Sequence, residues 1–569
     1  MALQVEEKQL SEHSARGLQK TFDVLVIGSG AAGSIAVKEL TERGLEVLLL
    51  EAGRDVTEAD FTPQPEGAPA AMSIGLGGRF RAALGGQPIQ ARRAMFQARG
   101  SRFLVNDLQQ PYSTQGGDFL WIRGRQLGGR LHSYGRVLLR SSDHDFKAAS
   151  HDGHGLDWPI SYADVAPYYD RVEDFLGLYG TTEHIDNLPD GHYRGPSLLT
   201  TSEEQFQSTV EERWPQRRVI PWRYAAPNLH RVPLGIFAAR QTGRLTTRTD
   251  AVVTRITVDQ KTGRADGAVF VDRLTKREHR ARADVVMLCA STIESIRLLL
   301  NSAADGHPNG LANSSGLLGQ YFMDQTPSLL FGDDPNHPGF ERIDPAPADP
   351  YYPPTGGVYL PRFENVEDVT DASFARGWAM QGTVGRLPVP TGYPGTVGLM
   401  GFGEMLAYKD NRVALHTWRK DAWGVPIPRI RLAIADNERA LMRAQVRGLR
   451  EMAEASGYKV NFAGSALGLD STKVWPNADP LSRALFILAF KKSLAMGAAI
   501  HECGGARMGS DPATSVLNEH NQSWDVPNLF VTDASSYVSN GAVGPTLTIM
   551  ALTARAAEYI ARAHESGSL

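Results

Sequence analysis

The sequence contains few cysteines. Only Cys289 and Cys503 occur in 569 residues, and they lie far apart. A disulfide framework and a metal site of the CxxC type are therefore excluded, so we expect no metal centre. The redox compartment stays open on this evidence.

Long hydrophobic runs are also absent, and neither sign of charge dominates. No apolar stretch reaches the roughly 18 residues of a membrane-spanning helix, so no membrane span is predicted. The net charge of −4 gives no reason to expect nucleic acid or an anionic membrane as a partner. Residues 1–20 form a polar tail without the apolar core of a signal peptide, which predicts a cytoplasmic location. Export together with a partner subunit stays open.

The composition is that of a globular protein. Hydrophobic residues make up 42% and charged residues 21% of the chain, which is enough apolar material for a packed core. A length of 569 residues exceeds what one core uses, so at least two structural units are expected.

Residues 22–53 predict a βαβ unit. The run at 24–27 is short, apolar and rich in β-branched residues, and the run at 47–50 is again apolar. Between them, residues 31–43 carry apolar side chains at helical spacing. A strand, a helix and a strand in this order open a parallel doubly wound sheet.

A GxGxxG motif, formed by Gly28, Gly30 and Gly33, lies at the turn from the first strand to the helix. The first glycine permits the tight turn, the second lets a pyrophosphate approach the backbone, and the third lets helix and strand pack closely. Glu51 follows the second strand, where a carboxylate can accept a hydrogen bond from a ribose hydroxyl. The motif predicts a bound dinucleotide and leaves NAD and FAD both open.

The middle of the chain changes character twice. Residues 54–120 are rich in Gly, Pro, Gln and Arg without sustained periodicity, which favours a lid or interface excursion. Residues 245–290 alternate like strands joined by hairpins, and the last strand, at 285–289, is fully apolar.

A second domain is indicated from about 315 to 495, where Pro, Tyr and Gly accompany strand-like pieces. The C-terminal part then returns to the first pattern. It predicts a buried strand at 528–532, a glycine-bearing loop and a helix at 546–563.

Several sequence blocks carry a resemblance to a known family. They are LEAG at 50–53, WIRGRQLGG at 121–129, WPISYADVAPYYDRVE at 158–173, HECGGARMG starting at His501, and VTDAS followed by GPTLTIMALTARAA. They span nearly the whole chain in family order. The chain resembles the glucose–methanol–choline (GMC) flavoproteins. Within this family the blocks are most similar to bacterial glucoside 3-dehydrogenases, to gluconate dehydrogenase flavoprotein subunits and to pyranose oxidases.

The resemblance implies an α/β fold, with a Rossmann-like FAD-binding domain and a substrate domain built on a mostly antiparallel sheet. It places the ADP half of FAD at the GxGxxG motif, the flavin ring at a glycine pair, and the ribityl–flavin region near the C-terminal blocks. The implied cofactor-binding residues are Gly28, Gly30, Gly33, Glu51, Arg123, Gly128, Gly129, Val252, Ala290, Asp533 and Thr546.

His501 falls on the family's catalytic histidine. An imidazole can take a hydroxyl proton while flavin N5 accepts the hydride from the same carbon. The resemblance therefore implies oxidation of an alcohol on a sugar, glycoside, aminosugar or polyol. Oxygen, a quinone or a cytochrome would serve as the electron acceptor.

Two positions depart from the family pattern. The family usually has Asn or His before the Pro of the PTLT block, where this chain has Gly544, without any side-chain donor or acceptor. Asn540, four residues earlier, is our candidate for the missing polar group and for a second catalytic residue. In some sugar oxidases a histidine tethers FAD covalently. The corresponding residue is Ser133, with His132 beside it, so we expect non-covalent FAD.

The expected division of the chain alternates between two domains. After the tail, 21–145 forms the first FAD-binding part with its lid at 54–120, 146–239 is a connecting or substrate-domain segment, 240–315 is the second FAD-binding part, 316–495 is the substrate domain, and 496–569 is the third FAD-binding part. Two alternatives stay open. One is a lyase-type enzyme whose FAD is not reduced, and the other is a flavoprotein subunit that needs a small subunit and a cytochrome.

Overall fold

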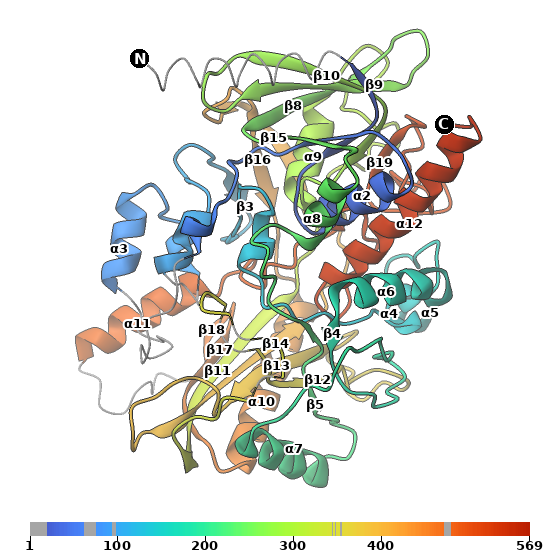
Figure 1. Cartoon of the computed structure of the whole chain (residues 1–569). Coiled ribbons are helices and arrows are strands. Elements are labelled where there is room, and N and C mark those ends of the chain that lie inside the picture. The colour runs from blue at the N-terminus through green and yellow to red at the C-terminus, as the bar shows by residue number, and fades with distance from the viewer. Residues whose placement is uncertain are drawn as a thin grey trace.

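Two seven-stranded sheets organise the chain (Figure 1). The computed structural model describes residues 20–61, 76–93, 98–343, 345–347, 349–352, 355–470 and 480–569. One sheet lies in the upper half of the view, near the C-terminus, and the other lies in the lower half.

The first sheet contains the parallel core that the sequence predicts. Its order is β7-β2-β1-β10-β9-β8, and β19 pairs with β10 off this path. Its strands are β1 (Thr21–Ile27), β2 (Val47–Leu50), β7 (Leu245–Arg248), β8 (Ala251–Val258), β9 (Ala265–Asp272), β10 (Glu278–Leu288) and β19 (Leu529–Val531). The pairs β7–β2, β2–β1, β1–β10 and β10–β19 are parallel, whereas β8 and β9 are antiparallel additions. The apolar runs predicted as strands become these parallel members, because a strand covered on both faces has apolar side chains on both.

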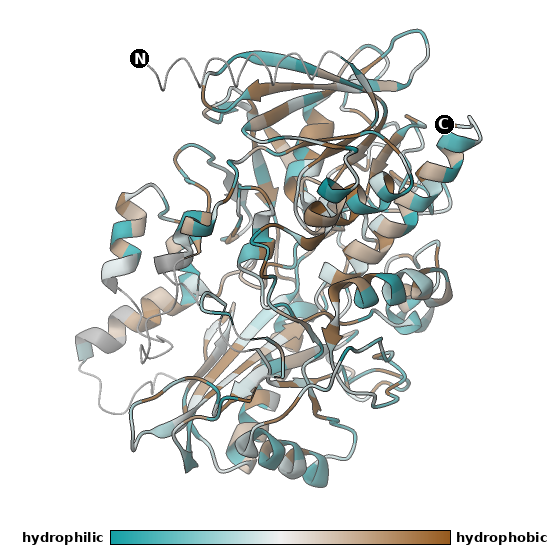
Figure 2. Cartoon of the chain, viewed as in Figure 1, coloured by the Kyte–Doolittle hydropathy of each residue, from teal (hydrophilic) through white to brown (hydrophobic). Residues whose placement is uncertain are grey.

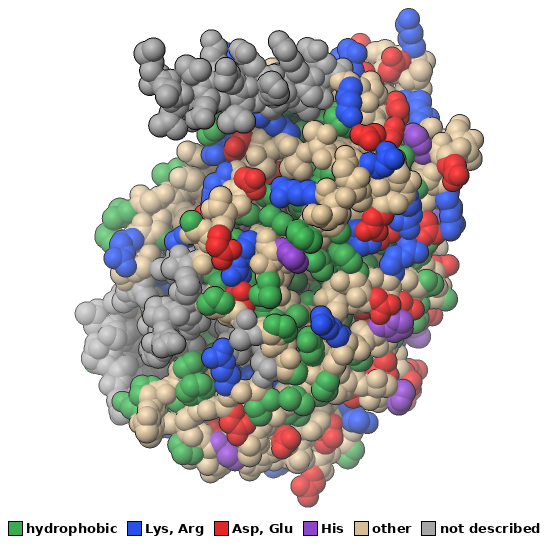
Figure 3. Space-filling model, viewed as in Figure 1, with side chains coloured by type: hydrophobic (Ala, Val, Ile, Leu, Met, Phe, Trp, Pro, Cys, Tyr) green, Lys and Arg blue, Asp and Glu red, His purple; other side chains and the backbone are tan. Residues whose placement is uncertain are grey.

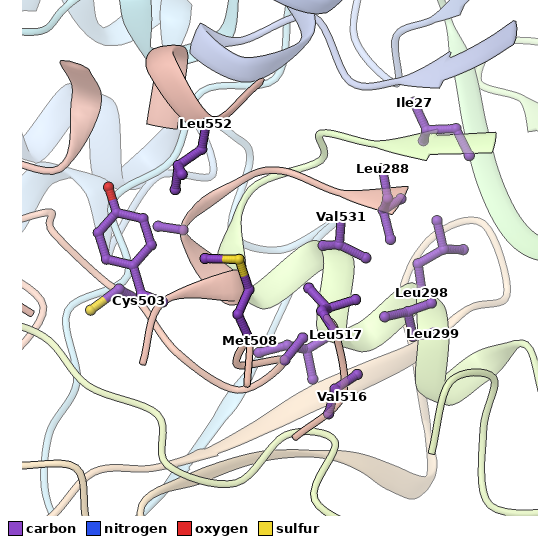
Figure 4. Packing of buried hydrophobic residues seen from close by; sticks show 14 of the residues in the cluster. Ile27, Leu288, Leu298, Leu299, Cys503, Met508, Val516, Leu517, Val531 and Leu552 are labelled. Atoms are coloured by element: carbon purple, nitrogen blue, oxygen red, sulfur yellow. The ribbon is translucent and has the colours of Figure 1, made fainter. Parts of the chain in front are cut away.

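Helices cover both faces of this sheet. They are α2 (Ala31–Glu42), α8 (Leu234–Gln241), α9 (Thr292–Asn301) and α12 (Thr546–Glu565), with α6 (Tyr162–Leu176) packed outside α12. Figure 4 shows Leu288 of β10 and Val531 of β19 near Leu298 and Leu299 of α9, and all four side chains belong to one buried cluster. The predicted helix at 546–563 is confirmed as α12.

The second sheet is antiparallel throughout, with the order β18-β17-β11-β14-β13-β12-β5. Its strands are β5 (Ile220–Pro221), β11 (Thr326–Pro338), β12 (Val358–Leu360), β13 (Trp378–Val384), β14 (Pro394–Gly403), β17 (Lys459–Ser465) and β18 (Gly468–Leu469). Helix α10 (Asp436–Ala455) packs on β11, β14 and β17, and α7 (Thr201–Arg213) packs on α10. Figure 2 shows mixed hydrophilic and hydrophobic colouring on these helices, consistent with one face turned to the sheet.

The remaining elements are short or peripheral. They are η1 (Glu58–Asp60), α3 (Leu76–Leu84), η2 (Gln90–Arg92), η3 (Ala98–Phe103), β3 (Ser113–Gln115), η4 (Gly129–His132), α4 (Asp143–Phe146), α5 (Ala148–Asp152), β4 (Leu178–Tyr179), β6 (Tyr224–Ala225), β15 (Arg412–Lys420), β16 (Pro426–Arg431), α11 (Pro480–Ser493) and η5 (Ala534–Ser536). The expected lid at 54–120 contains five of them. Residues 1–19 of the tail, and 62–75 and 94–97 of the lid, lie outside the described residues.

The hairpin of β15 and β16 departs from the expected division of the chain. It falls within 316–495, yet it pairs with β3 and packs against α9 of the first unit. Arg297 on α9 explains this placement, because its guanidinium donates to Asp421 and to the carbonyl of Pro426, both at 2.7 Å. A charge-assisted pair of this kind, buried on both sides, fixes the hairpin against the helix.

In the part of the chain that the structure describes, no helix is long and apolar enough to cross a membrane. Figure 3 shows Lys and Arg interspersed with Asp and Glu on the visible face, so no surface of one sign dominates there. This distribution agrees with the small net charge.

Candidate functional site

A cavity of about 600 Å³ is lined by residues of both sheets. The first unit contributes the carboxyl ends of β1, β2 and β10 and the starts of α2 and α12. The second sheet contributes side chains of β11, β13 and β14. In open α/β sheets a ligand binds outside the carboxyl ends of the strands, so the cavity lies where a dinucleotide is expected.

Two glycines of the GxGxxG motif allow the backbone to pack closely. Gly28 has φ +99°, and a Cβ there would lie 2.4 Å from the carbonyl oxygen of Cys289. A Cβ on Gly33 would lie 1.8 Å from the carbonyl oxygen of Gly28. No other residue fits these two positions, because the colliding atoms are backbone and have no room to move.

Gly30 and Gly129 differ, because they border open space. A Cβ on Gly30 would meet nothing within 4 Å, and a Cβ on Gly129 would have the Cα of Gly30 as its nearest atom, at 3.8 Å. Gly30 also lies at the N-terminus of α2, whose first amides carry a partial positive charge. The open gap beside Gly30, at a helix N-terminus, fits a pyrophosphate, and a side chain at this position would enter it.

Ser29 connects the acidic residue to the second glycine block. Its hydroxyl donates to Glu51 at 2.5 Å and accepts from the amide of Gly128 at 2.9 Å. Glu51 also accepts from the amide of Gly53 at 2.7 Å. Burial raises the pKa of Glu51. This carboxylate lies at the end of β2, where the motif predicts the ribose contact.

The other predicted cofactor-binding residues also line the cavity; they are Arg123, Val252, Ala290, Asp533 and Thr546. The Arg123 guanidinium stacks 3.8 Å above the Trp121 ring, and burial lowers the pKa of Arg123 to about 10. Asp533 accepts from the Ser295 hydroxyl and from the amide of Ser535, so it joins α9 to η5. Thr546 is the first residue of α12, whose N-terminal end faces the cavity.

His501 lines the cavity, and its ring is held from behind by Gln325. The Nδ1 atom of His501 lies 2.5 Å from Oε1 of Gln325. The Nε2 atom of Gln325 donates to the carbonyls of Gly541 and Val543, at 2.5 and 2.9 Å. Two carbonyl acceptors on one side fix which end of this amide is nitrogen, so Oε1 must face the histidine.

This arrangement determines the tautomer of His501. Since Oε1 of Gln325 only accepts, Nδ1 carries the proton and donates, and Nε2 keeps a free lone pair. Burial, with a smaller effect of the Arg130 charge, lowers the pKa of His501 to about 3. The imidazole is therefore neutral near pH 7, with the basic nitrogen at Nε2. A Cβ at Gly544 would lie 3.6 Å from that atom.

Asp324 holds the backbone of the same histidine. Its Oδ1 accepts from the amide of His501 at 3.0 Å, and its Oδ2 accepts from the amide of Gly497 at 2.8 Å. Burial, followed by the nearby charge of Glu502, raises the pKa of Asp324 to about 8. Consecutive residues 324 and 325 thus fix the main chain and the ring of His501.

The structure does not bring Asn540 to the cavity. Its Oδ1 accepts from the amide of Met405 at 3.0 Å, and its Nδ2 donates to the carbonyl of Asp324 at 3.2 Å. Both ends of this amide are used by main chain, and the residue is not among those that line the cavity. Asn540 therefore does not replace the side chain that Gly544 lacks; it supports the segment that carries Gln325.

His132 and Ser133 border the cavity beside the glycine pair. The ring of His132 stacks on Phe103 with centroids 5.2 Å apart, and its Nε2 lies 2.7 Å from the carbonyl of Leu127. This nitrogen therefore has a backbone partner. Ser133 is exposed and offers only a hydroxyl.

Sequence reasoning missed Ser29, Asp324 and Gln325. Ser29 lies inside the glycine motif, and a hydroxyl next to a turn was a local signal for it. Asp324 and Gln325 stand in the segment FMDQTP and give no local signal, because their partner His501 follows about 176 residues later.

Two family models match this chain. The model described as GMC oxidoreductase matches residues 407–553, and the model of an NAD(P)-binding Rossmann-like domain matches residues 26–67. The first match contains His501 and Gly544, and the second contains the GxGxxG motif and Glu51.

Several known proteins are similar to this chain over most of its length. The 2-methyl-1,2-propanediol dehydrogenase of Mycolicibacterium austroafricanum is 29% identical, over 95% of each chain. The fructose dehydrogenase large subunit of Gluconobacter japonicus is 25% identical, over 95% of this chain and 97% of that one. The crystal structure of pyridoxine 4-oxidase from Mesorbium loti has a TM-score of 0.60 at 17% identity, covers 95% of this chain and shares its fold.

We predict opposite consequences for two glycines of the motif. Gly30→Val should fold but lose the dinucleotide, because the added side chain fills open space that the pyrophosphate needs. Gly33→Ala should fail to fold, because its Cβ collides with the carbonyl of Gly28. Circular dichroism and the cofactor content per folded chain test both variants. Full cofactor content in Gly30→Val would show that this gap does not receive the ligand.

A second prediction concerns the tautomer. In protein labelled with ¹⁵N-histidine, the resonances lost in His501→Gln should show a protonated Nδ1 and an unprotonated Nε2. Gln325→Leu removes the acceptor of Nδ1–H, so the protonated fraction of Nε2 should rise. Gln325→Glu should keep Nδ1 protonated, unlike Gln325→Leu, and should raise the pKa of His501, because it places an acceptor with negative charge beside Nδ1.

Gln320→Leu is the matched control for these variants. Its amide donates only to the carbonyl of Gly316, outside the cavity, so the His501 resonances should not change. A Gln325→Leu spectrum identical to that of the wild type would contradict the proposed tautomer lock.

Proposed function

We propose that this chain is a GMC oxidoreductase that binds FAD and oxidises a hydroxyl group of a sugar-like or polyol compound. A Rossmann-like domain within this family implies FAD as the dinucleotide. One observation supports the chemistry above all: a neutral histidine, fixed by Gln325, presents an unprotonated Nε2 at a cavity that fits the cofactor.

Named groups would hold the cofactor in this proposal. The open gap beside Gly30 would receive the pyrophosphate, Glu51 the ribose, and Val252 the adenine side. The N-terminal amides of α12, from Thr546, would face the flavin region. FAD, when bound there, supplies the acceptor for the hydride that leaves the carbinol carbon.

His501 would act as the general base. Its Nε2 takes the hydroxyl proton as the carbinol C–H bond breaks, so the alcohol becomes a carbonyl compound. Gln325 keeps the lone pair on Nε2, and Asp324 keeps the residue in place. With Gly544 in place of the usual polar residue, His501 acts alone on the substrate oxygen.

The proposal also covers the attachment of FAD, the division into domains, the electron acceptor and a partner subunit. Non-covalent FAD is supported by Ser133, which stands where some sugar oxidases have the histidine that tethers the cofactor. The FAD-binding domain would comprise 21–145, 240–315 and 496–569, now with the hairpin at 412–431 packed on it. Oxygen, a quinone or a cytochrome would reoxidise the flavin. A small partner subunit is part of the proposal because one similar protein is named as a large subunit.

A lyase-type reaction is the second candidate, and the glycine at 544 favours it. It differs in one observable: the flavin stays oxidised while product forms. Anaerobic mixing with sugars, glycosides, polyols and simple diols separates the two, because oxidation of the substrate bleaches the flavin and a lyase reaction does not.

We predict that acid or heat releases the cofactor. The purified protein should be yellow, and precipitation should leave intact FAD in the supernatant, because a serine stands at position 133, where some sugar oxidases have the histidine that tethers FAD. Absorbance and mass of the supernatant measure this. A yellow pellet under a colourless supernatant would mean a covalent bond.

We predict that His501→Ala slows anaerobic flavin reduction by about 10²–10⁴-fold, the usual contribution of a general base, with FAD content near normal. Since the pKa of His501 is lowered to about 3, the imidazole stays neutral at pH values well below the ordinary pKa of a histidine. The acid limb of the wild-type rate should therefore lie below pH 6.5.

Stopped-flow reduction from about pH 5 to about pH 9 measures both effects. Reduction of His501→Ala at the wild-type rate across this range would make His501 structural. An acid limb at or above pH 6.5 would mean that burial does not control its protonation.

A further inference from the structure

The wall of the cavity next to His501 is apolar. Pro327 and Leu329 of β11 stand opposite Phe402 and Met400 of β14 in the antiparallel register, so the four side chains share one face of the sheet. All four line the cavity. The Phe402 ring lies 5.3 Å from the ring of His501, so this wall begins at the proposed base.

The segment after α11 continues the wall with side chains that share the same apolar character. They are Leu494, Ala498, Ala499 and Ile500. Leu494 and Ala498 join Leu329 and Met400 in one hydrophobic cluster, which Phe331, Phe462 and Phe490 complete. Because the side chains that pack against this part of the wall are apolar as well, rotation of one of them brings no polar group to the ligand.

Gln381 is the one polar side chain that the second sheet gives to the described lining. It lies on β13 opposite Met400, and its amide nitrogen lies 3.9 Å from where a Cβ on Gly135 would be. Its carboxamide makes no hydrogen bond to any residue that the structure describes. It can therefore bind one polar atom of a ligand, in addition to the hydroxyl at His501.

A compound rich in hydroxyls fits this surface poorly. Each hydroxyl placed against the wall loses its water and gains no partner, which costs binding free energy. An alkyl or aryl group in the same place gains by burial. The wall thus favours an alkyl or aryl group beside the reacting carbon. His501 and Gln381 can each bind one oxygen of the substrate.

We infer that the substrate carries a branched alkyl or aryl group beside the oxidised carbon, and one further oxygen for Gln381. This rests on the proposed function. The carbinol C–H leaves as hydride to FAD, the hydroxyl proton goes to Nε2 of His501, and a carbonyl forms. Oxygen, a quinone or a cytochrome would take up the two electrons that bound FAD would receive with the hydride.

Two substrate pairs test the inference with the FAD-loaded enzyme and a dye acceptor: 2-methyl-1,2-propanediol against glycerol, and 1-phenyl-1,2-ethanediol against 1,2,3,4-butanetetrol. The apolar member of a pair should have the higher kcat/KM, by about 10-fold or more, because one methylene in an apolar pocket gives about 10–200-fold. An equal or higher kcat/KM for glycerol and 1,2,3,4-butanetetrol would overturn the inference, while the proposed function would stand.

Met400→Gln adds a direct test of the wall, because it exchanges a thioether for an amide at similar volume. The preference for the apolar member should fall by about 10-fold, whereas Met400→Leu, which stays apolar, should retain it. An unchanged preference in Met400→Gln would also overturn the inference. If none of the four compounds, and no alcohol of a wider screen, bleaches the bound flavin, the proposed function itself fails.

Discussion

The carboxamide of Gln325 is the interaction on which the site depends. It stands immediately before β11 of the second sheet, and its three partners, His501, Gly541 and Val543, belong to the C-terminal segment that returns to the first sheet. One amide thus sets the tautomer of the histidine, holds the loop that leads to α12, and joins the two halves of the molecule. Since every polar atom of this buried side chain is used, breaking one bond leaves partners without water or replacement, which costs about 1–3 kcal/mol each.

The opposite end of the cavity depends on backbone rather than side chains. Gly28 and Gly33 let β1, β10 and α2 meet at distances that exclude a Cβ, and this contact leaves the gap at Gly30 open. Ser29 then links Glu51 to the second glycine block through a single hydroxyl. Gly28, Ser29, Gly33 and Glu51 come from one short stretch of sequence, which Gly128 and Cys289 meet in the fold. His501 and Gln325 share no such stretch and are brought together by folding alone.

This contrast explains what the sequence could and could not predict. The strands at 24–27 and 47–50, the helix starting at residue 31 and the helix of α12 follow from apolar periodicity, which is a local property. The role of Gln325 does not, because nothing near it signals a partner about 176 residues away. Asn540 looked suitable only by its spacing from Gly544; the fold turned its amide to the backbone of Met405 and Asp324. The β15–β16 hairpin was misplaced for a similar reason, since its pairing with β3 is not encoded in its own pattern.

Both ends of the cavity fit an oxidation of an alcohol. The protein fixes one proton acceptor, Nε2 of His501, and the cavity wall beside it is apolar. The most direct measurement is anaerobic flavin reduction by an alcohol that the enzyme turns over, compared with the same alcohol carrying deuterium on the carbinol carbon. The account predicts that the alcohol bleaches the flavin without oxygen, and that deuterium slows bleaching severalfold because the C–H bond breaks in that step. Product formation with the flavin still oxidised, or bleaching at the same rate for both isotopes under single-turnover conditions, would contradict it.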